Sequence, residues 1–202
     1  MLAVAAVIGR DFELETLRRV AEMPDETLID ALAEARRIAV LEESARVGIV
    51  RYRFAHAFFR QTLYEEMVAP RRLRIHQQVA RALESQYSTR LDDHAAELAE
   101  HFAQSTDAED LKKAVHYGEL AARRAVAVYA YGEAVRLLEQ AIEVQGVLDP
   151  DDRAKRCDLL LTQGEAILPS EEPSRAATRA APEAFTLAEA LKTTRCGLSA
   201  PP

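Results

Sequence analysis

A chain of 202 residues with 49% hydrophobic and 29% charged residues has the size of one large or two small domains and is expected to be a soluble globular protein. Its net charge of -7 is too small to predict a nucleic-acid or membrane partner by itself. Only 7 glycines occur, and alanine and leucine are abundant, so the composition favours helices.

The sequence contains no recognisable export or membrane signal. Residues 1–8 are apolar but lack a preceding basic region, and no run approaches the roughly 18 apolar residues of a membrane span. The two cysteines, Cys157 and Cys196, are too far apart to indicate a disulfide framework or a metal site. We therefore expect a cytoplasmic protein.

Residues 1–69 predict a winged-helix-like domain. Residues 3–8 are compatible with either a helix end or a buried strand, and Asp11 is the expected cap of the first full helix. The pattern then predicts two helices and a two-stranded ribbon, at 13–21, from 24 to about 37, at 38–42 and at 49–54. Two helices followed by a ribbon is the order of a winged helix.

The stretch 51–67 changes from a strand to a helix at His56. Before His56, apolar Tyr52 and Phe54 alternate with arginines, which is typical of a half-buried strand. After it, the apolar residues have helical spacing, so we expect a helix over 55–68; they are Phe58, Phe59, Leu63 and Met67.

The rest of the chain predicts stacked helices. They are expected at 70–87, 93–104, from 106 to about 130, at 131–145, at 149–167 and at 174–191. Thr106 with Glu109 matches a capping box, and Asp149-Pro150 is a typical helix start. Pro182 is expected to break the last helix. We divide this part into a helical spacer (70–110), tetratricopeptide-like hairpins (111–191) and a disordered tail (192–202).

Small residues repeat at fixed spacings in the predicted hairpins. Ala122 and Ala134 are twelve residues apart, as are Gly164 and Ala176, and the two pairs are offset by 42. Small side chains at these positions let two helices approach closely, which is the physical basis of the tetratricopeptide pattern. Ordinary helical bundles also have small residues at helix contacts, so the pattern alone does not distinguish a tetratricopeptide repeat from such a bundle.

Several motifs, taken in order, resemble the C-terminal part of bacterial STAND-type P-loop ATPases, as fused to class III nucleotide cyclases or LuxR-type regulators. They are AVIGRDF (6–12), YRFAH (52–56), Arg60, LYEE (63–66), RRLRIH (71–76) and the helical run 95–141. The resemblance covers about residues 3–170. It implies a winged helix, a helical spacer and tetratricopeptide repeats, with the ATPase module upstream.

The resemblance implies that His56 senses a bound nucleotide. In that family a histidine at the position of His56 faces the β-phosphate of bound ADP and holds the inactive state. The alternative is a histidine that caps the following helix. This sequence has no G-x-x-x-x-G-K-S/T phosphate loop, so ATP and ADP are expected only in a parent protein that carries the module. That parent would bind ATP and could be a nucleotide cyclase.

Arginines are concentrated between Arg46 and Arg90, where nine occur. Guanidinium groups bind carboxylates and phosphates bidentately, so this region is a candidate interface. The interface candidates are Arg51, Arg53, Arg60, Arg71, Arg72 and Arg74. The alternative is a solvated surface whose arginines pair with acidic neighbours.

Three other functions have partial support in the sequence. Wing arginines could contact DNA phosphates, but Asp25, Glu26, Asp30 and Glu34 on the preceding helix would be repelled by the duplex. A stand-alone tetratricopeptide adaptor also fits the hairpins. His94, Glu97 and His101 share one helix face, yet without further ligands they predict no metal site, and His76 and His116 are expected in the core or an interface.

The sequence thus predicts a mainly α-helical, non-enzymatic regulatory fragment with no catalytic residue and no metal. Its winged helix would couple the nucleotide state of an upstream P-loop module to partner binding, or to cyclase or transcription output. The hairpins would bind a protein or peptide. Neither nucleic acid nor membrane is an expected partner, and a DNA-binding winged-helix regulator is the first alternative.

Overall fold

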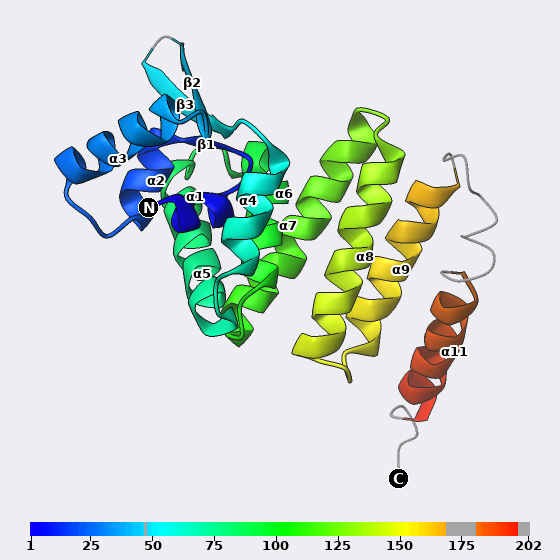
Figure 1. The fold of residues 1–202 in the computed structure, drawn as a ribbon. Helices are drawn as coiled ribbons and strands as arrows, with labels where there is room; N and C mark the ends of the chain where they lie inside the picture. The colour runs from blue at the N-terminus through cyan, green and yellow to red at the C-terminus, as the bar shows by residue number, and fades with distance from the viewer. Residues whose placement is uncertain (47, 169–180, 198–202) are drawn as a thin grey trace. The chain divides into compact units, whose positions relative to one another are not determined.

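The computed structural model describes residues 1–46, 48–168 and 181–197, with side chains of the last segment only at 182–190. The described chain is mainly helical with one small antiparallel sheet, which confirms the predicted fold class. It divides into two compact units, Met1–Thr89 and Arg90–Pro202 (Figure 1). Each unit is described by itself.

The N-terminal unit begins with the element order of a winged helix. Its elements are α1 (Leu2–Ile8), β1 (Asp11–Glu13), α2 (Leu14–Val20), α3 (Asp25–Arg37), β2 (Leu41–Arg46) and β3 (Ile49–Phe54). The three strands form an antiparallel sheet in the order β1-β3-β2. The ribbon of β2 and β3 was predicted, although β2 starts three residues later than expected because 38–40 turn the chain after α3.

Strand β1 was missed, and Asp11 does not cap a helix as predicted. Asp11 instead pairs with Arg53 of β3, and the N-cap of α2 is Glu13. The three residues of β1 bring Phe12 opposite Tyr52, with the ring centres 6.0 Å apart. This third strand closes the sheet over the core.

The core of the N-terminal unit lies between the sheet and its helices. Phe12 and Phe54 contact each other from the sheet, and Leu28 and Leu32 reach them from successive turns of α3. Their spacing places both leucines on one helix face. Residues 5–7 are buried on α1, so the ambiguous start of the chain is a helix.

Two further helices complete this unit: α4 (Ala57–Glu65) and α5 (Ala69–Gln86). Helix α4 is shorter at both ends than the predicted 55–68, whereas α5 has Pro70 in its first turn as expected. Helix α5 buries Ile75, Val79 and Leu83 and packs against α1 and α2. The unit therefore ends at Thr89, and the predicted boundary at residue 69 does not separate a spacer from the winged helix.

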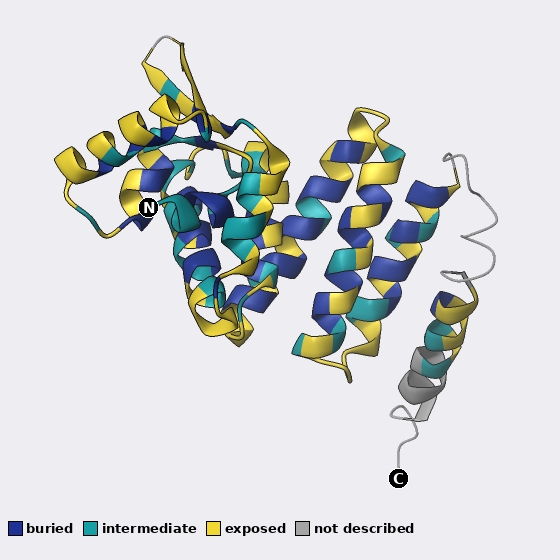
Figure 2. Cartoon of the chain, viewed as in Figure 1, coloured by how far each residue is buried: buried dark blue, intermediate teal, exposed yellow. Residues whose placement is uncertain are grey.

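The second unit is a row of helices. It contains a short 3-10 helix η1 (Leu91–His94), α6 (Ala95–Ala103), α7 (Ala108–Ala127), α8 (Tyr131–Leu148), α9 (Arg153–Ile167) and α11 (Ala181–Gly197). Each long helix packs on the next one along the chain, from α6 to α11. Figure 2 shows buried residues recurring along α7, α8 and α9 with exposed residues between them. The helices thus pack in chain order, and the tetratricopeptide-like repeat stays a prediction.

Two of the predicted helix starts are shifted. Asp107, not Thr106, is the N-cap of α7, and its Oδ1 accepts hydrogen bonds from the backbone N–H groups of Glu109 (3.0 Å) and Asp110 (3.2 Å). Asp152, not Asp149, caps α9 and accepts from the N–H of Lys155 at 2.9 Å. In both helices, the aspartate side chain accepts a hydrogen bond from the backbone N–H three residues later. That N–H lies in the first turn and has no partner within the helix.

The pair α7 and α8 approaches closely through small residues. Ala122 and Ala134 are fully buried, and a Cβ added at Gly118 would lie 3.2 Å from the Cβ of Ala141. Glycine at 118 therefore allows this approach, although the spacing of small residues in the sequence does not indicate it. A Cβ at Gly164 would meet no atom within 4 Å, and Ala176 lies outside the described residues.

The C-terminal helix differs from its prediction. Pro182 lies in the first turn of α11 rather than breaking a helix, because the missing N–H of proline is not needed there. The helix continues to Gly197, so the predicted disordered tail is wrong for 192–197; residues 198–202 lie outside the described residues. None of the helices in 1–168 or 181–197 is long and apolar enough to cross a membrane.

Candidate functional site

His56 occupies the junction between the sheet and α4. It is the N-cap residue of α4, with extended backbone, yet its side chain accepts no capping hydrogen bond. The ring is exposed and lies 5.9 Å from the ring of Phe59. The alternative of a side-chain cap is therefore wrong, and the imidazole is accessible to a group outside the N-terminal unit.

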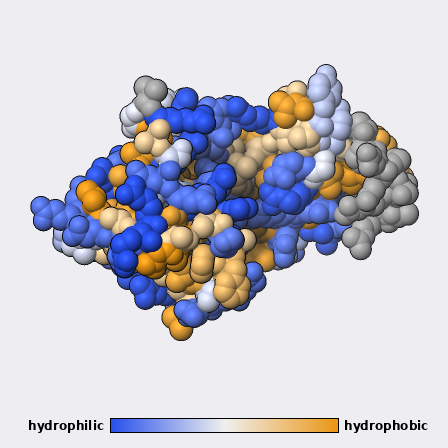
Figure 3. Space-filling model, turned by 45° about the horizontal axis from the view of Figure 1, so that its top comes forward, coloured by the Kyte–Doolittle hydropathy of each residue, from blue (hydrophilic) through white to orange (hydrophobic). Residues whose placement is uncertain are grey.

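Helix α4 presents apolar surface beside this histidine. None of its residues is buried, and Phe58 is 70% exposed. On the face shown in Figure 3, hydrophilic residues form most of the surface and apolar residues gather in separate patches between them. Phe58 and the exposed ring of His56 thus lie close together in the sequence at the start of α4.

The wing arginines are paired within the sheet. Arg51 Nη2 lies 2.7 Å from Glu13 Oε1, and Arg53 Nε lies 2.5 Å from Asp11 Oδ1, each across the β1–β3 register. Both arginines remain exposed, so water screens the two ion pairs and they stabilise the unit only weakly. Arg51 and Arg53 therefore pair with acidic neighbours, which is the alternative that the sequence left open.

Arg60 and Arg72 surround Tyr64 instead of facing a partner. The guanidinium carbons of Arg60 and Arg72 lie 5.8 Å and 4.8 Å from the centre of the Tyr64 ring. Arg60 Nε also donates to the backbone oxygen of Ala6 at 2.9 Å, which ties α4 to α1. These contacts give both arginines a role inside the N-terminal unit.

His76 lies at the centre of the same cluster. It is 3% exposed, and its Nε2 shares a hydrogen bond of 2.9 Å with the hydroxyl of Tyr64. Burial, with the positive charges of Arg72 and Arg60, lowers the pKa of His76 to about 4. The ring is therefore neutral near pH 7, as suits a histidine packed beside two guanidinium groups.

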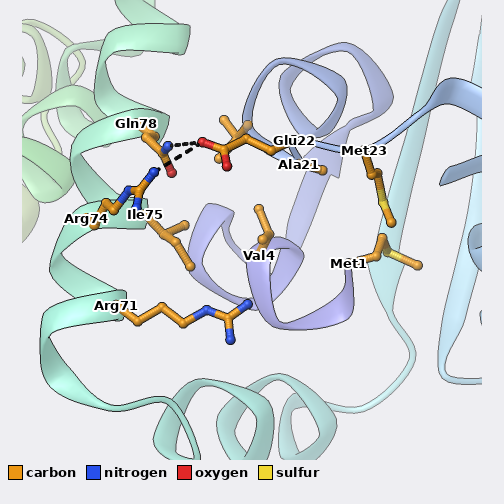
Figure 4. Close-up of a pocket in the computed structure, with 10 residues that line it drawn as sticks. Met1, Val4, Ala21, Glu22, Met23, Arg71, Arg74, Ile75 and Gln78 are labelled. Atoms are coloured by element: carbon orange, nitrogen blue, oxygen red, sulfur yellow. Dashed lines mark hydrogen bonds and ion pairs between the residues drawn. The ribbon is translucent and has the colours of Figure 1, made fainter.

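The last two interface candidates line a cavity between α1, the end of α2 and α5 (Figure 4). Arg74 Nη2 lies 3.5 Å from Glu22 Oε1, which also accepts a hydrogen bond of 2.8 Å from Gln78 Nε2. Arg71 points toward the cavity and takes part in no hydrogen bond or ion pair within the described part of the chain. Arg72 also lacks such a bond but lies over the Tyr64 ring, whereas burial and then the charge of Arg71 lower the pKa of the Met1 N-terminal ammonium.

Helix α3 does not offer a surface suited to DNA. Its four acidic residues, Asp25, Glu26, Asp30 and Glu34, are all exposed. The two arginines at its C-terminal end are already paired, with Glu43 at 2.7 Å and with Glu34 at 2.6 Å. A helix with this charge would be repelled by phosphates in the groove.

The remaining histidines do not gather into a metal site. His94 Nδ1 lies 3.1 Å from Glu97 Oε2, and His101 is buried on α6. His116 is exposed, so of the two expected places, core or interface, the core is wrong. Within the described ranges, no group of three or more histidine, cysteine, aspartate or glutamate side chains could hold a metal ion. Of the three residues on this helix face, His94 pairs with Glu97, and His101 is buried.

Two residues that tie elements together escaped the sequence reasoning. Glu13 accepts hydrogen bonds from Arg51, from Gln86 Nε2 at 3.3 Å and from the hydroxyl of Tyr87 at 2.9 Å. In the helical unit, Lys155 Nζ donates to both carboxylate oxygens of Glu119 at 2.8 Å. Both groups of hydrogen bonds join segments that are distant in the sequence. Helical periodicity reports only on neighbouring turns, so it does not indicate these bonds.

Comparison of the chain with protein-family models, with curated proteins and with solved structures found no match.

Proposed function

We propose that the chain is a non-catalytic regulatory part of a STAND-type P-loop signalling ATPase. In this role it couples the nucleotide state of an upstream P-loop module to partner binding, or to cyclase or transcription output. The observation that carries the proposal is the combination of a winged-helix element order with a row of helical hairpins in one chain. The proposal is also supported by the motifs that occur in the same order as in that family.

His56 is the proposed contact with nucleotide. Its accessible ring, at the point where β3 leads into α4, can donate a hydrogen bond to the β-phosphate of ADP held by the P-loop module. Phe58 would pack against the same module. ATP and ADP would be bound by that module, so this chain itself supplies no catalytic residue.

The helical unit is the proposed partner-binding part. Its hairpins stack side by side, and such rows offer an extended surface to a peptide or protein. A stand-alone cytoplasmic adaptor is the second candidate function, favoured by the separate core of this unit, in which Phe102, Leu138 and Leu159 are fully buried. The exposed acids of α3 disfavour a DNA-binding regulator.

Replacing His56 with alanine in the complete parent protein is expected to weaken ADP binding about 10- to 100-fold, the effect of losing one hydrogen bond to a charged group. Output should rise, since ADP holds the inactive state in this proposal. The measurement is the ADP affinity of the purified parent by calorimetry, together with its output activity.

His116→Ala is the matched control, because His116 is also exposed but lies on α7 in the helical unit. It should leave ADP affinity and output unchanged. If His56→Ala changes neither quantity, His56 has no part in nucleotide sensing.

A further inference from the structure

Strand β2 is an edge strand whose outer side is unpaired. The sheet order β1-β3-β2 places β3 on one side of β2, and among the described residues no strand pairs with its other side. Residues 42–46 are all exposed, and in Figure 1 the ribbon of β2 and β3 projects from the helices of the N-terminal unit. An exposed edge presents backbone donors and acceptors, so another strand can pair with it.

The hydrogen-bond pattern identifies which backbone groups of β2 face outward. The N–H of Ala55 donates to the backbone oxygen of Val40 at 3.0 Å. In an antiparallel pair, every second residue bonds toward the partner strand. Counted from Val40, the residues of β2 that bond toward β3 are Glu42, Ser44 and Arg46. The N–H and C=O groups of Glu43 and Ala45 therefore point away from β3, and they have no hydrogen-bond partner in the part of the chain that the structure describes.

A second copy of the chain can pair its own β2 with this edge, antiparallel about a two-fold axis at Ser44. Glu43 then lies opposite the partner's Ala45, and Ala45 lies opposite the partner's Glu43. The outward backbone groups of both residues meet, so each of these symmetric pairs exchanges both of its N–H···O bonds.

The same register brings opposite charges together. Glu42 lies opposite the partner's Arg46, in a pair without backbone hydrogen bonds, where the side chains come closest. An axis at Glu43 would instead place this carboxylate opposite its own copy, and like charges directly opposite are destabilising. An axis at Ala45 would place Arg46 opposite the partner's Ser44 and leave its charge unmatched. The charges therefore favour the axis at Ser44.

The two charged residues of this contact are not matched within the ribbon. Arg46 is exposed and takes part in no hydrogen bond or ion pair within the described residues, and its neighbour on β3 is Ile49. Glu42 lies opposite Arg53, which is already paired with Asp11. A second β2 strand therefore supplies the opposite charge to each of them.

We propose that the chain forms a two-fold dimer through antiparallel pairing of β2, which joins the sheets of two copies into one continuous sheet. One short strand from each copy is expected to bury less than about 1,200 Å² in total, which is the range of transient complexes. The dimer therefore forms at high protein concentration. His56 lies outside the contact, so the dimer is independent of the nucleotide contact proposed above.

The test is hydrogen exchange of the full 202-residue chain, measured by nuclear magnetic resonance at several protein concentrations alongside sedimentation equilibrium. As the dimer forms, exchange of the N–H groups of Glu43 and Ala45 should slow, because only the dimer gives them a partner. The N–H of Ser44 bonds toward β3 in the monomer as well, so its exchange should change far less.

Charge variants test the role of Arg46. Arg46→Glu should weaken the dimer about ten-fold, because like charges then face each other at both symmetric positions. Arg46→Lys should retain most of the affinity. Arg123→Glu is the matched control, since it makes the same charge change at an exposed position on α7, and it should dimerise as the wild type does.

A backbone variant and a disulfide test the pairing itself. Ala45→Pro removes an outward N–H but no bond to β3, so it should leave the unit folded and abolish the dimer. In the proposed register the two copies of Ser44 lie opposite each other, with Cα atoms about 4.5 Å apart, which a disulfide can bridge. Oxidised Ser44→Cys should therefore link the copies at this position, identified by mass spectrometry, and much faster than Glu42→Cys does.

The proposal is overturned if the chain stays monomeric at every concentration, or if Arg46→Glu or Ala45→Pro dimerises as tightly as the wild type. A dimer in which exchange of Glu43 and Ala45 does not depend on concentration would also overturn it, because that dimer would use another surface.

Discussion

Acidification from pH 7 to pH 4 is expected to lower the free energy of unfolding of the N-terminal unit. The decrease should be about 3 kcal/mol larger for the wild type than for a His76→Gln variant. The unfolded imidazole binds a proton as the pH falls through about 6.5, whereas the folded ring, with a pKa of about 4, resists protonation. The stability from His76 is therefore fully present above about pH 6.5 and is lost as the pH falls toward 4.

The measurement is urea unfolding at several pH values, followed by signals of Leu17 and Val79, which are both fully buried in this unit. Carboxylates contribute to the pH dependence of both proteins, so the difference between wild type and variant isolates His76. His116→Gln, which removes an exposed histidine, should retain the wild-type slope. Identical slopes for wild type and His76→Gln would show that His76 is not held neutral.

Gly118→Leu is expected to destabilise the helical unit by about 2–3 kcal/mol or more. The leucine Cβ would lie 3.2 Å from the Cβ of Ala141 and 3.6 Å from the backbone oxygen of Leu137, and neither atom can move without shifting α8. Overpacking of this kind forces helices apart. Urea unfolding followed by signals of Leu138 measures the cost.

Gly132→Leu is the matched control for this substitution. Gly132 is also helical, but it is exposed, and a Cβ there would meet no atom within 4 Å. The variant should be as stable as the wild type or up to about 1 kcal/mol more stable, because leucine favours helix over glycine. Equal losses at both positions would contradict the close approach of α7 and α8.

Local signals allowed most of the helices to be predicted from the sequence. Pro70 marks the start of α5, and the apolar spacing of Leu28 and Leu32 identifies the buried face of α3. These signals act within one or two turns, so they do not depend on the rest of the fold.

Features that depend on distant partners were missed. Strand β1 has only three residues, too few to show alternation, and it exists because β3 pairs with it some forty residues later. The effect of Pro182 depends on where α11 starts, since proline is disruptive inside a helix and favourable in the first turn.

The candidate site could be predicted only as a region. The sequence identifies the concentration of arginines, but pairing decides what each one does. Arg51 and Arg53 find acidic partners on the unpredicted strand β1, whereas Arg71 points toward a cavity. Likewise, the apolar stripe of α5 predicts that His76 is buried but does not identify Tyr64 as its hydrogen-bond partner.

The central claim is that this chain regulates a P-loop module encoded with it. The most direct test is to determine the coding sequence upstream of the Met1 codon in the source genome. We expect the reading frame to continue upstream and to encode a G-x-x-x-x-G-K-S/T phosphate loop. An in-frame stop codon directly upstream, with a ribosome-binding site before Met1, would contradict it and favour a stand-alone helical adaptor.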